Sequence, residues 1–238
     1  MNFGPAKLCV ALDAMPEEDA LRLTERLRGT VDVVKIGLGL HSRSGPRIVD
    51  SMLEQGHEVF LDLKLHDIPV QVADAVRVAC EQGVHYLTLH TGGAGPMMRG
   101  ASSVRDEFGG NGPRLLGVSI LTSMASNDLV DVGMNADLSS VVKKRVALAA
   151  ECGLDGVVCS PADLSFLREE GQTSSLFFVT PGVRPTGTDA GDQQRITTPA
   201  EAVSMGSNML VVGRPIRNAA DPAVAAKAIK AEMEQALG

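Results

Sequence analysis

The chain has 238 residues, of which 44% are hydrophobic and 21% charged. This composition is typical of a soluble globular protein and excludes a disordered chain. The formal net charge of -7 argues against non-specific binding to nucleic acid or to an anionic membrane, although a local cluster of Arg and Lys can still bind an anionic small molecule.

Targeting segments and cysteine motifs are not recognisable. The N-terminal run MNFGPAKLCVALD lacks the long apolar region of a signal peptide. No apolar stretch approaches the ~20 residues of a membrane span, so we expect a cytoplasmic protein. The cysteines form no CxxC pair, which suits neither a zinc site nor a disulfide framework. They are Cys9, Cys80, Cys152 and Cys159.

Short apolar runs alternate with longer amphipathic stretches along the whole chain. Runs of a few residues that are almost continuously apolar are typical of strands covered on both faces. The predicted strands are Lys7–Asp13, Val31–Gly37, Glu58–Lys64, Tyr86–His90, Leu115–Ile120, Gly156–Ser160, Leu176–Thr180 and Met209–Gly213.

The stretches between these runs follow the pattern of helices. The first places Ala20, Leu23 and Leu27 on one face. Several others begin at a proline and end at a glycine, the usual asymmetry of a helix. The predicted helices are 16–27, 69–83, 139–153, 161–171 and 199–206, followed by a last helix capped by Asp221.

Strict alternation of eight strands with helices predicts a closed α/β barrel, the (β/α)8 TIM barrel, as a single domain over residues 1–238. The length alone would also permit two smaller domains. An open doubly wound sheet is the alternative fold. It has less support, because no GxGxxG follows the first strand and no GxxxxGK[ST] occurs in the sequence.

Charged residues gather where the first three predicted strands end. Asp13 ends the first strand, Lys35 lies in the second, and the third reads Asp62-Leu-Lys64-Leu-His-Asp67. In a strand, Asp62 and Lys64 share one face, so both should point into the mouth of the barrel. Burying such charges is costly unless each is paired, which favours a functional cluster over an idle one. Mg²⁺ prefers oxygen ligands without ammonium groups, so the interleaved lysines argue against a metal.

A second cluster follows the last two strands. Residues 180–195 form a glycine-rich segment containing Arg184, and Gly213-Arg214 ends the eighth strand. Loops after strands seven and eight are the usual phosphate site of a barrel, and guanidinium groups suit a phosphate dianion. A solvated surface loop is the alternative for the long segment. His90 could contact a ligand or have a structural role.

These residues together resemble the orotidine 5′-phosphate decarboxylase family, from Asp13 to Arg214. The most specific motif is Asp62-Leu-Lys64-Leu-His-Asp67-Ile68-Pro69, similar to the family signature DxKxxDIP. The supporting segments are Ala-Leu-Asp13, Lys35-Ile-Gly, Leu-Thr122-Ser, Thr180-Pro-Gly-Val-Arg184, Gln193-Gln194-Arg195 and Val-Gly213-Arg214. The resemblance implies decarboxylation of orotidine 5′-monophosphate to uridine 5′-monophosphate in pyrimidine biosynthesis, without metal or cofactor.

The resemblance also implies a role for each residue. Lys64 would donate a proton to C6 of the pyrimidine, Asp62 would face the substrate carboxylate, and Lys35 and Asp67 would complete the charged network. Asp67 is expected to enter the site of the partner subunit of a homodimer. The implied substrate-binding residues are Asp13, Lys35, Asp62, Ile68, Pro69, Thr122, Arg184, Gln193, Gly213 and Arg214. Spacing alone leaves Gln194 as an alternative to Gln193.

Two other functions remain open from the sequence. The first is a 3-keto-6-phosphogulonate decarboxylase or hexulose-phosphate synthase, which share the barrel and the DxKxxD motif but use Mg²⁺. The second is a nucleotide-phosphate binding protein without catalysis. The Asp62, Lys64 and Asp67 set argues against the second, because binding alone would not require so costly a cluster of charges.

Overall fold

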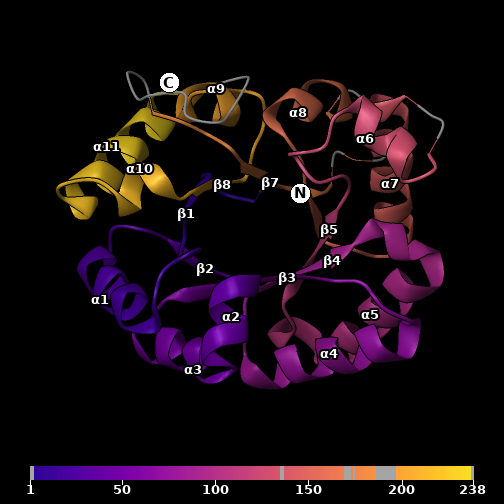
Figure 1. Cartoon of the computed structure of the whole chain (residues 1–238), viewed down its shortest axis with the longest axis horizontal. Coiled ribbons are helices and arrows are strands. Elements are labelled where there is room, and N and C mark those ends of the chain that lie inside the picture. The colour runs from indigo at the N-terminus through magenta and orange to yellow at the C-terminus, as the bar shows by residue number, and fades with distance from the viewer. Residues whose placement is uncertain (1–2, 135–136, 169–172, 174, 186–196, 237–238) are drawn as a thin grey trace.

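The computed structural model describes residues 3–134, 137–168, 173, 175–185 and 197–236. Within them eight parallel strands form a closed barrel, which Figure 1 shows at the centre of a ring of helices. The strands are β1 (Lys7–Ala11), β2 (Val33–Gly37), β3 (Glu58–Leu65), β4 (Tyr86–His90), β5 (Arg114–Val118), β6 (Gly156–Val158), β7 (Phe177–Pro181) and β8 (Met209–Val212).

Closure of the barrel decides between the two folds considered from the sequence. β1 pairs in parallel with β2 on one side and with β8 on the other, with Cys9 opposite Val33 and Val211. An open doubly wound sheet would leave two strands at its edges unpaired. The predicted (β/α)8 barrel is therefore confirmed, and the eight predicted strands match the observed ones to within a few residues.

The helices form the outer layer, and their ends follow the sequence signals. α4 begins with Pro69; the first residue of a helix makes no hydrogen bond through its N–H, so a proline costs nothing there. The helix ends before Gly83, which has a φ of +77°. The Asp221 carboxylate accepts hydrogen bonds from the N–H groups of Ala223 and Val224, as its predicted cap role requires. The helices are α1 (Glu17–Leu27), α2 (Leu38–Ser44), α3 (Arg47–Glu54), α4 (Pro69–Gln82), α5 (Ala94–Glu107), α6 (Ser126–Asp131), α7 (Leu138–Glu151), α8 (Pro161–Leu167), α9 (Pro199–Ser204), α10 (Arg214–Arg217) and α11 (Pro222–Gln235), with short 3₁₀ helices η1 (Thr91–Gly93) and η2 (Gly109–Asn111).

Each predicted helix is present, and all but one end within two residues of the prediction. The prediction for 161–171 is longer than α8, which ends at Leu167, and Gly171 lies outside the described residues. α2, α3, α5, α6 and α10 were not predicted as separate helices. No described helix has both the length and the apolar character that crossing a membrane requires.

Side chains on the two faces of the strands build two separate cores. The larger core lies between the barrel and the helices and includes Leu8, Val10 and Leu12 from β1 and the residue after it. The smaller core fills the barrel interior and includes Cys9, Phe60 and others from every strand. Since the interior is packed with apolar side chains, charged groups have room only at the two ends of the barrel: Lys7 and Glu58 pair at the amino end, and a second charged group lies at the carboxyl end.

Candidate active site

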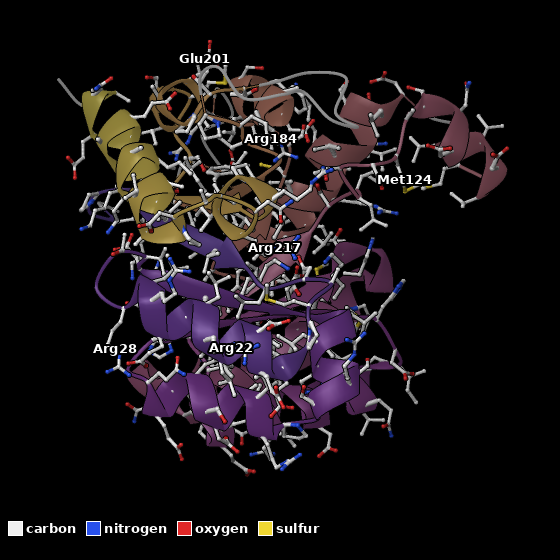
Figure 2. The ribbon with its side chains drawn as sticks, turned by 60° about the vertical axis from the view of Figure 1, so that its left-hand side comes forward. Arg22, Arg28, Met124, Arg184, Glu201 and Arg217 are labelled. Carbon is white, nitrogen blue, oxygen red and sulfur yellow. The ribbon has the colours of Figure 1, made fainter. Side chains whose placement is uncertain are left out.

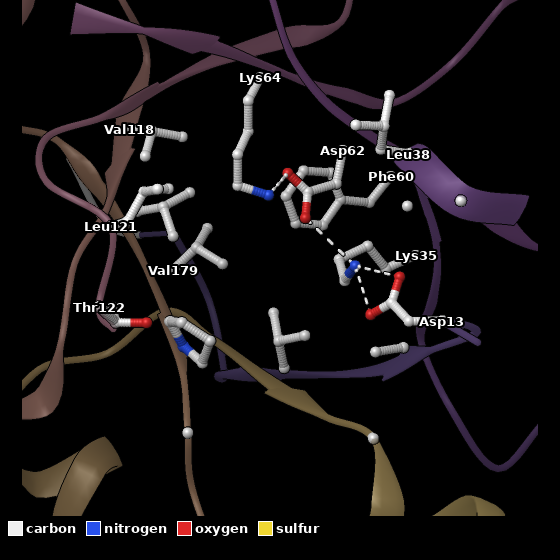
Figure 3. A pocket seen from close by; sticks show the side chains of 18 of the residues that line it. Asp13, Lys35, Leu38, Phe60, Asp62, Lys64, Val118, Leu121, Thr122 and Val179 are labelled. Carbon is white, nitrogen blue, oxygen red and sulfur yellow. Dashed lines mark hydrogen bonds and ion pairs between the residues drawn. The ribbon is translucent and has the colours of Figure 1, made fainter. Parts of the chain in front are cut away.

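A pocket of about 520 Å³ opens at the carboxyl ends of the strands, where a barrel of this kind places its chemistry. Its floor is apolar and includes Phe60, Val158 and Val179. Asp13, Lys35, Asp62 and Lys64 gather on one wall, and Figure 3 shows them joined by hydrogen bonds and ion pairs. The charged residues that line the pocket are Asp13, Lys35, Asp62, Lys64, Arg184, Arg214 and Arg217.

Lys35 is the centre of the charged wall. Its Nζ lies 3.0 and 2.9 Å from the two carboxylate oxygens of Asp13, and 3.1 Å from Asp62 Oδ2. Lys35 and Asp62 are both buried, at 7% and 8% exposure. Buried charges are tolerated only where each is paired, and here each ammonium or carboxylate has a partner of opposite sign.

The chain of charges continues from Asp62 to Lys64. Lys64 Nζ donates a hydrogen bond of 2.9 Å to Asp62 Oδ1. The two side chains therefore meet in the barrel mouth, and Leu61, Leu63 and Leu65 face the outer core, as the sequence predicts. A row of alternating charges thus runs from β1 across β2 to β3.

The backbone that presents Lys64 is not a regular strand. Lys64 has a φ of +52°, a left-handed conformation that is rare for residues other than glycine. The register between β3 and β4 shifts between Leu61 and Leu65. A β-bulge of this kind can re-aim a side chain beside an active site. The simple alternation used in the sequence prediction reached the right orientation but did not reveal the bulge.

The ion pairs keep the buried charges ionised. Burial alone would raise the pKa of Asp62, but Lys35, Lys64 and hydrogen bonds from Lys64 and Thr88 outweigh it and hold that pKa below its usual value. Burial alone would lower the pKa of Lys35, but the carboxylates of Asp62 and Asp13 reverse that effect and raise it. An ionised carboxylate therefore stands between two ammonium groups.

The part of the pocket wall after β7 and β8, next to β1, is rich in guanidinium groups and glycine. Gly182 and buried Arg184 follow β7, and Gly213, Arg214 and Arg217 follow β8. Figure 2 labels Arg184 and Arg217. Planar guanidinium forks bind phosphate oxygens in pairs, so this wall is suited to a phosphate group, as the sequence predicts.

Backbone contacts join Val183 and Arg184, after β7, to Thr197, before α9. Arg184 N donates to the carbonyl oxygen of Thr197 at 3.1 Å, and Val183 pairs with Thr197 as an isolated bridge. Gln193 and Gln194, the two candidates for an additional phosphate ligand, lie outside the described residues.

Of the remaining predicted residues that the structure describes, one lines the pocket and a segment of three does not. Thr122 lies on the pocket wall, beside Leu121. Asp67, Ile68 and Pro69 are exposed and do not line this pocket in the described part of the chain. The Asp67 carboxylate accepts a hydrogen bond of 2.7 Å from the N–H of Ile68.

Sequence reasoning missed several residues of the site. Arg217 lines the pocket and donates to the backbone carbonyl of Asp13. Gly37 lies so close to the Asp13 carboxylate that a Cβ at this position would overlap Asp13 Oδ1. Thr88 is fully buried and bonds to Asp62. Thr88 lies between Tyr86 and His90 on the inward face of β4, so alternation along the strand could have indicated it.

Comparisons with known proteins agree with this geometry. A family model described as "Orotidine 5'-phosphate decarboxylase / HUMPS family" matches residues 6–229. The orotidine 5'-phosphate decarboxylase of Pasteurella multocida is 42% identical over 229 residues, covering 96% of this chain and 97% of that protein. That of Vibrio parahaemolyticus is 42% identical over 224 residues, covering 94% and 95%. The crystal structure of the Lactobacillus acidophilus enzyme of that name superposes with a TM-score of 0.83 at 33% identity, covering 96% of this chain and 99% of that one. The chain therefore belongs to the orotidine 5′-phosphate decarboxylase / HUMPS family.

Proposed function

We propose that this chain decarboxylates orotidine 5′-monophosphate to uridine 5′-monophosphate and carbon dioxide, a step of pyrimidine biosynthesis. The observation that carries the proposal is the chain of charges Lys35–Asp62–Lys64 at the barrel mouth. Relatives at 42% identity over nearly the whole chain carry the name of this enzyme. The pocket volume of about 520 Å³ is in the range that binds small molecules.

The chemical step requires a cation beside the reacting carbon. When the bond from C6 to the carboxylate breaks, the electron pair stays on C6 and carbon dioxide leaves. The Lys64 ammonium lies ready to stabilise that charge and then to transfer its proton to C6, giving the product. Asp62, held ionised by its neighbours, fixes the position of the Lys64 ammonium at 2.9 Å. Solvent then returns a proton to Lys64.

Asp62 also faces the group that leaves. A substrate carboxylate bound above C6 would lie beside the Asp62 carboxylate, and repulsion between the two would raise the energy of the bound substrate. Departure of neutral carbon dioxide removes that repulsion. The lysines on either side of Asp62 keep its negative charge in place throughout.

The pocket wall after β7 and β8 would supply most of the binding energy for the substrate. In this proposal Arg184, Gly213 and Arg214, which line the pocket, bind the 5′-phosphate. Gln193, which lies outside the described residues, would bind it as well. Asp13 and Lys35 would bind the ribose hydroxyls, and Thr122 the edge of the pyrimidine. Phosphate binding distant from C6 can hold the base against Lys64, so that remote contacts assist the chemical step.

The active form that we propose is a cytoplasmic homodimer with active sites at the subunit interface. Asp67, Ile68 and Pro69 are exposed beside the pocket-forming end of β3 and outside their own pocket. In a dimer they would reach the pocket of the second subunit, where Asp67 would complete the charged network.

We further propose that the reaction needs no metal or cofactor. Both carboxylates of the pocket wall, Asp13 and Asp62, already bind lysine ammonium groups, which would compete with a cation such as Mg²⁺. The test is the ultraviolet absorbance of orotidine 5′-monophosphate mixed with purified protein, with and without excess EDTA. We expect equal turnover in both. Turnover that EDTA abolishes would contradict the metal-free mechanism, and no turnover in either would contradict the substrate and favour a sugar phosphate.

A further inference from the structure

Thr88 of β4 stands opposite the irregular part of β3. Leu61 pairs with Leu87, and Leu65 pairs with Leu89. Three residues of β3, 62–64, therefore face the single residue Thr88. The extra length must bulge out of the ladder, and this explains why the residue before Leu65 adopts a left-handed backbone.

The Thr88 hydroxyl forms two hydrogen bonds that bridge this bulge. Its Oγ1 accepts a hydrogen bond of 2.9 Å from the backbone N–H of Lys64. The same hydroxyl donates a hydrogen bond of 2.9 Å to Asp62 Oδ1. One side chain thus binds the backbone that carries the ammonium and the carboxylate that the ammonium contacts.

Both bonds have physical consequences for the charged pair. The first gives the Lys64 N–H, displaced from the regular ladder, a partner that a buried amide requires. Holding a residue other than glycine at a φ of +52° costs free energy, and the surrounding contacts must supply it. The second bond fixes Oδ1, the oxygen that also accepts from Lys64 Nζ.

We propose that Thr88 is a positioning residue that sets the separation and direction of Asp62 and Lys64 in the decarboxylation reaction. The inference rests on the proposed function. Thr88 is fully buried and does not line the pocket, so it acts through its two partners and not through the substrate. Without its hydroxyl, the backbone of Lys64 can relax toward the ordinary β region, which moves the ammonium away from C6.

Three variants separate this role from ordinary stability. Thr88→Val keeps the shape and removes the hydroxyl, whereas Thr88→Ser keeps the hydroxyl. Thr24→Val is the matched control, because Thr24 is also fully buried with its hydroxyl bonded to Ala20 O at 3.0 Å, but it lies on α1 outside the pocket. The measurements are kcat and KM for orotidine 5′-monophosphate, the dissociation constant of uridine 5′-monophosphate, and the melting temperature.

We expect Thr88→Val to lower kcat by about tenfold to a hundredfold, the value of a lost hydrogen bond to a charged group. Product affinity should stay within about threefold of the wild type, because phosphate and ribose contacts are intact. Thr88→Ser should restore most of kcat, and Thr24→Val should lower only the melting temperature. A wild-type kcat in Thr88→Val, or a loss that Ser does not restore, would overturn the proposal.

Failure of the proposed function would be visible separately, as absence of turnover in the wild type. The positioning role is then judged from a crystal structure of Thr88→Val. The proposal expects a changed Lys64 backbone and a lost contact between Lys64 Nζ and Asp62. Lys64 retained at its wild-type φ with the 2.9 Å contact intact would refute it.

Discussion

The guanidinium of Arg217 donates a hydrogen bond to the backbone carbonyl oxygen of Asp13, a residue 204 positions earlier in the chain. The bond ties α10, which follows β8, to the turn that follows β1, at the seam where the barrel closes. Asp13 in turn holds Lys35. Arg217 thereby links the guanidinium-rich wall of the pocket to the start of the charged chain.

Replacing Arg217 by Ala should weaken binding through Asp13. Because Asp13 is proposed to bind ribose, affinity for uridine 5′-monophosphate and for uridine should fall by the same factor, about tenfold for a hydrogen bond from a charged donor. Titration calorimetry with both ligands measures this. Arg22→Ala is the control, since Arg22 lies exposed on α1 and pairs with Asp19. If the variant loses affinity for uridine 5′-monophosphate but not for uridine, Arg217 acts on the phosphate instead.

Gly37 provides a second test of the Asp13 position. A Cβ added there would overlap Asp13 Oδ1 and approach Lys35 Nζ at 3.2 Å. Gly37→Ala should therefore displace the carboxylate and raise KM by about tenfold, with a smaller change in kcat. Gly110→Ala is the control, because a Cβ at Gly110 meets no atom within 4 Å and Gly110 does not line the pocket. Equal kinetics for the two variants would show that the position of the Asp13 carboxylate is unimportant.

The sequence predicted the barrel and its charged mouth for physical reasons that are local. Nearly continuous apolar runs identify buried strands, and a closed parallel barrel brings their carboxyl ends together. Asp13, Lys35, Asp62 and Lys64 therefore had to meet, and they do. Arg184 and Arg214 line the same pocket for the same reason.

What the sequence could not predict depends on contacts between distant segments. The bulge at Lys64 exists only because β3 and β4 pair with unequal lengths, and period-two alternation carries no sign of it. Arg217 lies on a four-residue helix that no pattern indicated. The role proposed for Asp67 requires a second subunit, so that role stays a prediction.

Shared active sites can be tested by mixing two inactive variants. Asp67→Ala and Lys64→Ala proteins are each expected to be inactive as homodimers. Heterodimers would contain one site with both residues intact, so mixing followed by subunit exchange should recover up to about a quarter of wild-type activity, the statistical share of intact sites. No recovery after exchange verified by mass spectrometry would place Asp67 in its own subunit's site.

His90 provides a prediction about pH. Burial, then the charges of His66, Arg145 and Lys64, lower its pKa to about 4, and its Nδ1 accepts from the N–H of Gly92. In the unfolded chain a histidine has its ordinary pKa of about 6.5. The unfolded state therefore binds more protons between these values, and the free energy of unfolding should fall as pH drops from about 6.5 to 4.

Denaturant unfolding at several pH values measures this loss, with His90→Gln compared with the wild type. The variant lacks the titrating group, so the stability difference between the two proteins should change across that pH range. A difference independent of pH would contradict the lowered pKa of His90.

The central claim is that Lys64 performs the chemistry while other residues hold the ligand. Its most direct test is Lys64→Ala, measured for turnover of orotidine 5′-monophosphate and for affinity toward uridine 5′-monophosphate. Lys7→Ala is the control, because Lys7 pairs with Glu58 and does not line the pocket. The account predicts a kcat reduced by at least about a thousandfold in Lys64→Ala, with product binding retained and Lys7→Ala active. Turnover near the wild-type rate in Lys64→Ala would contradict it.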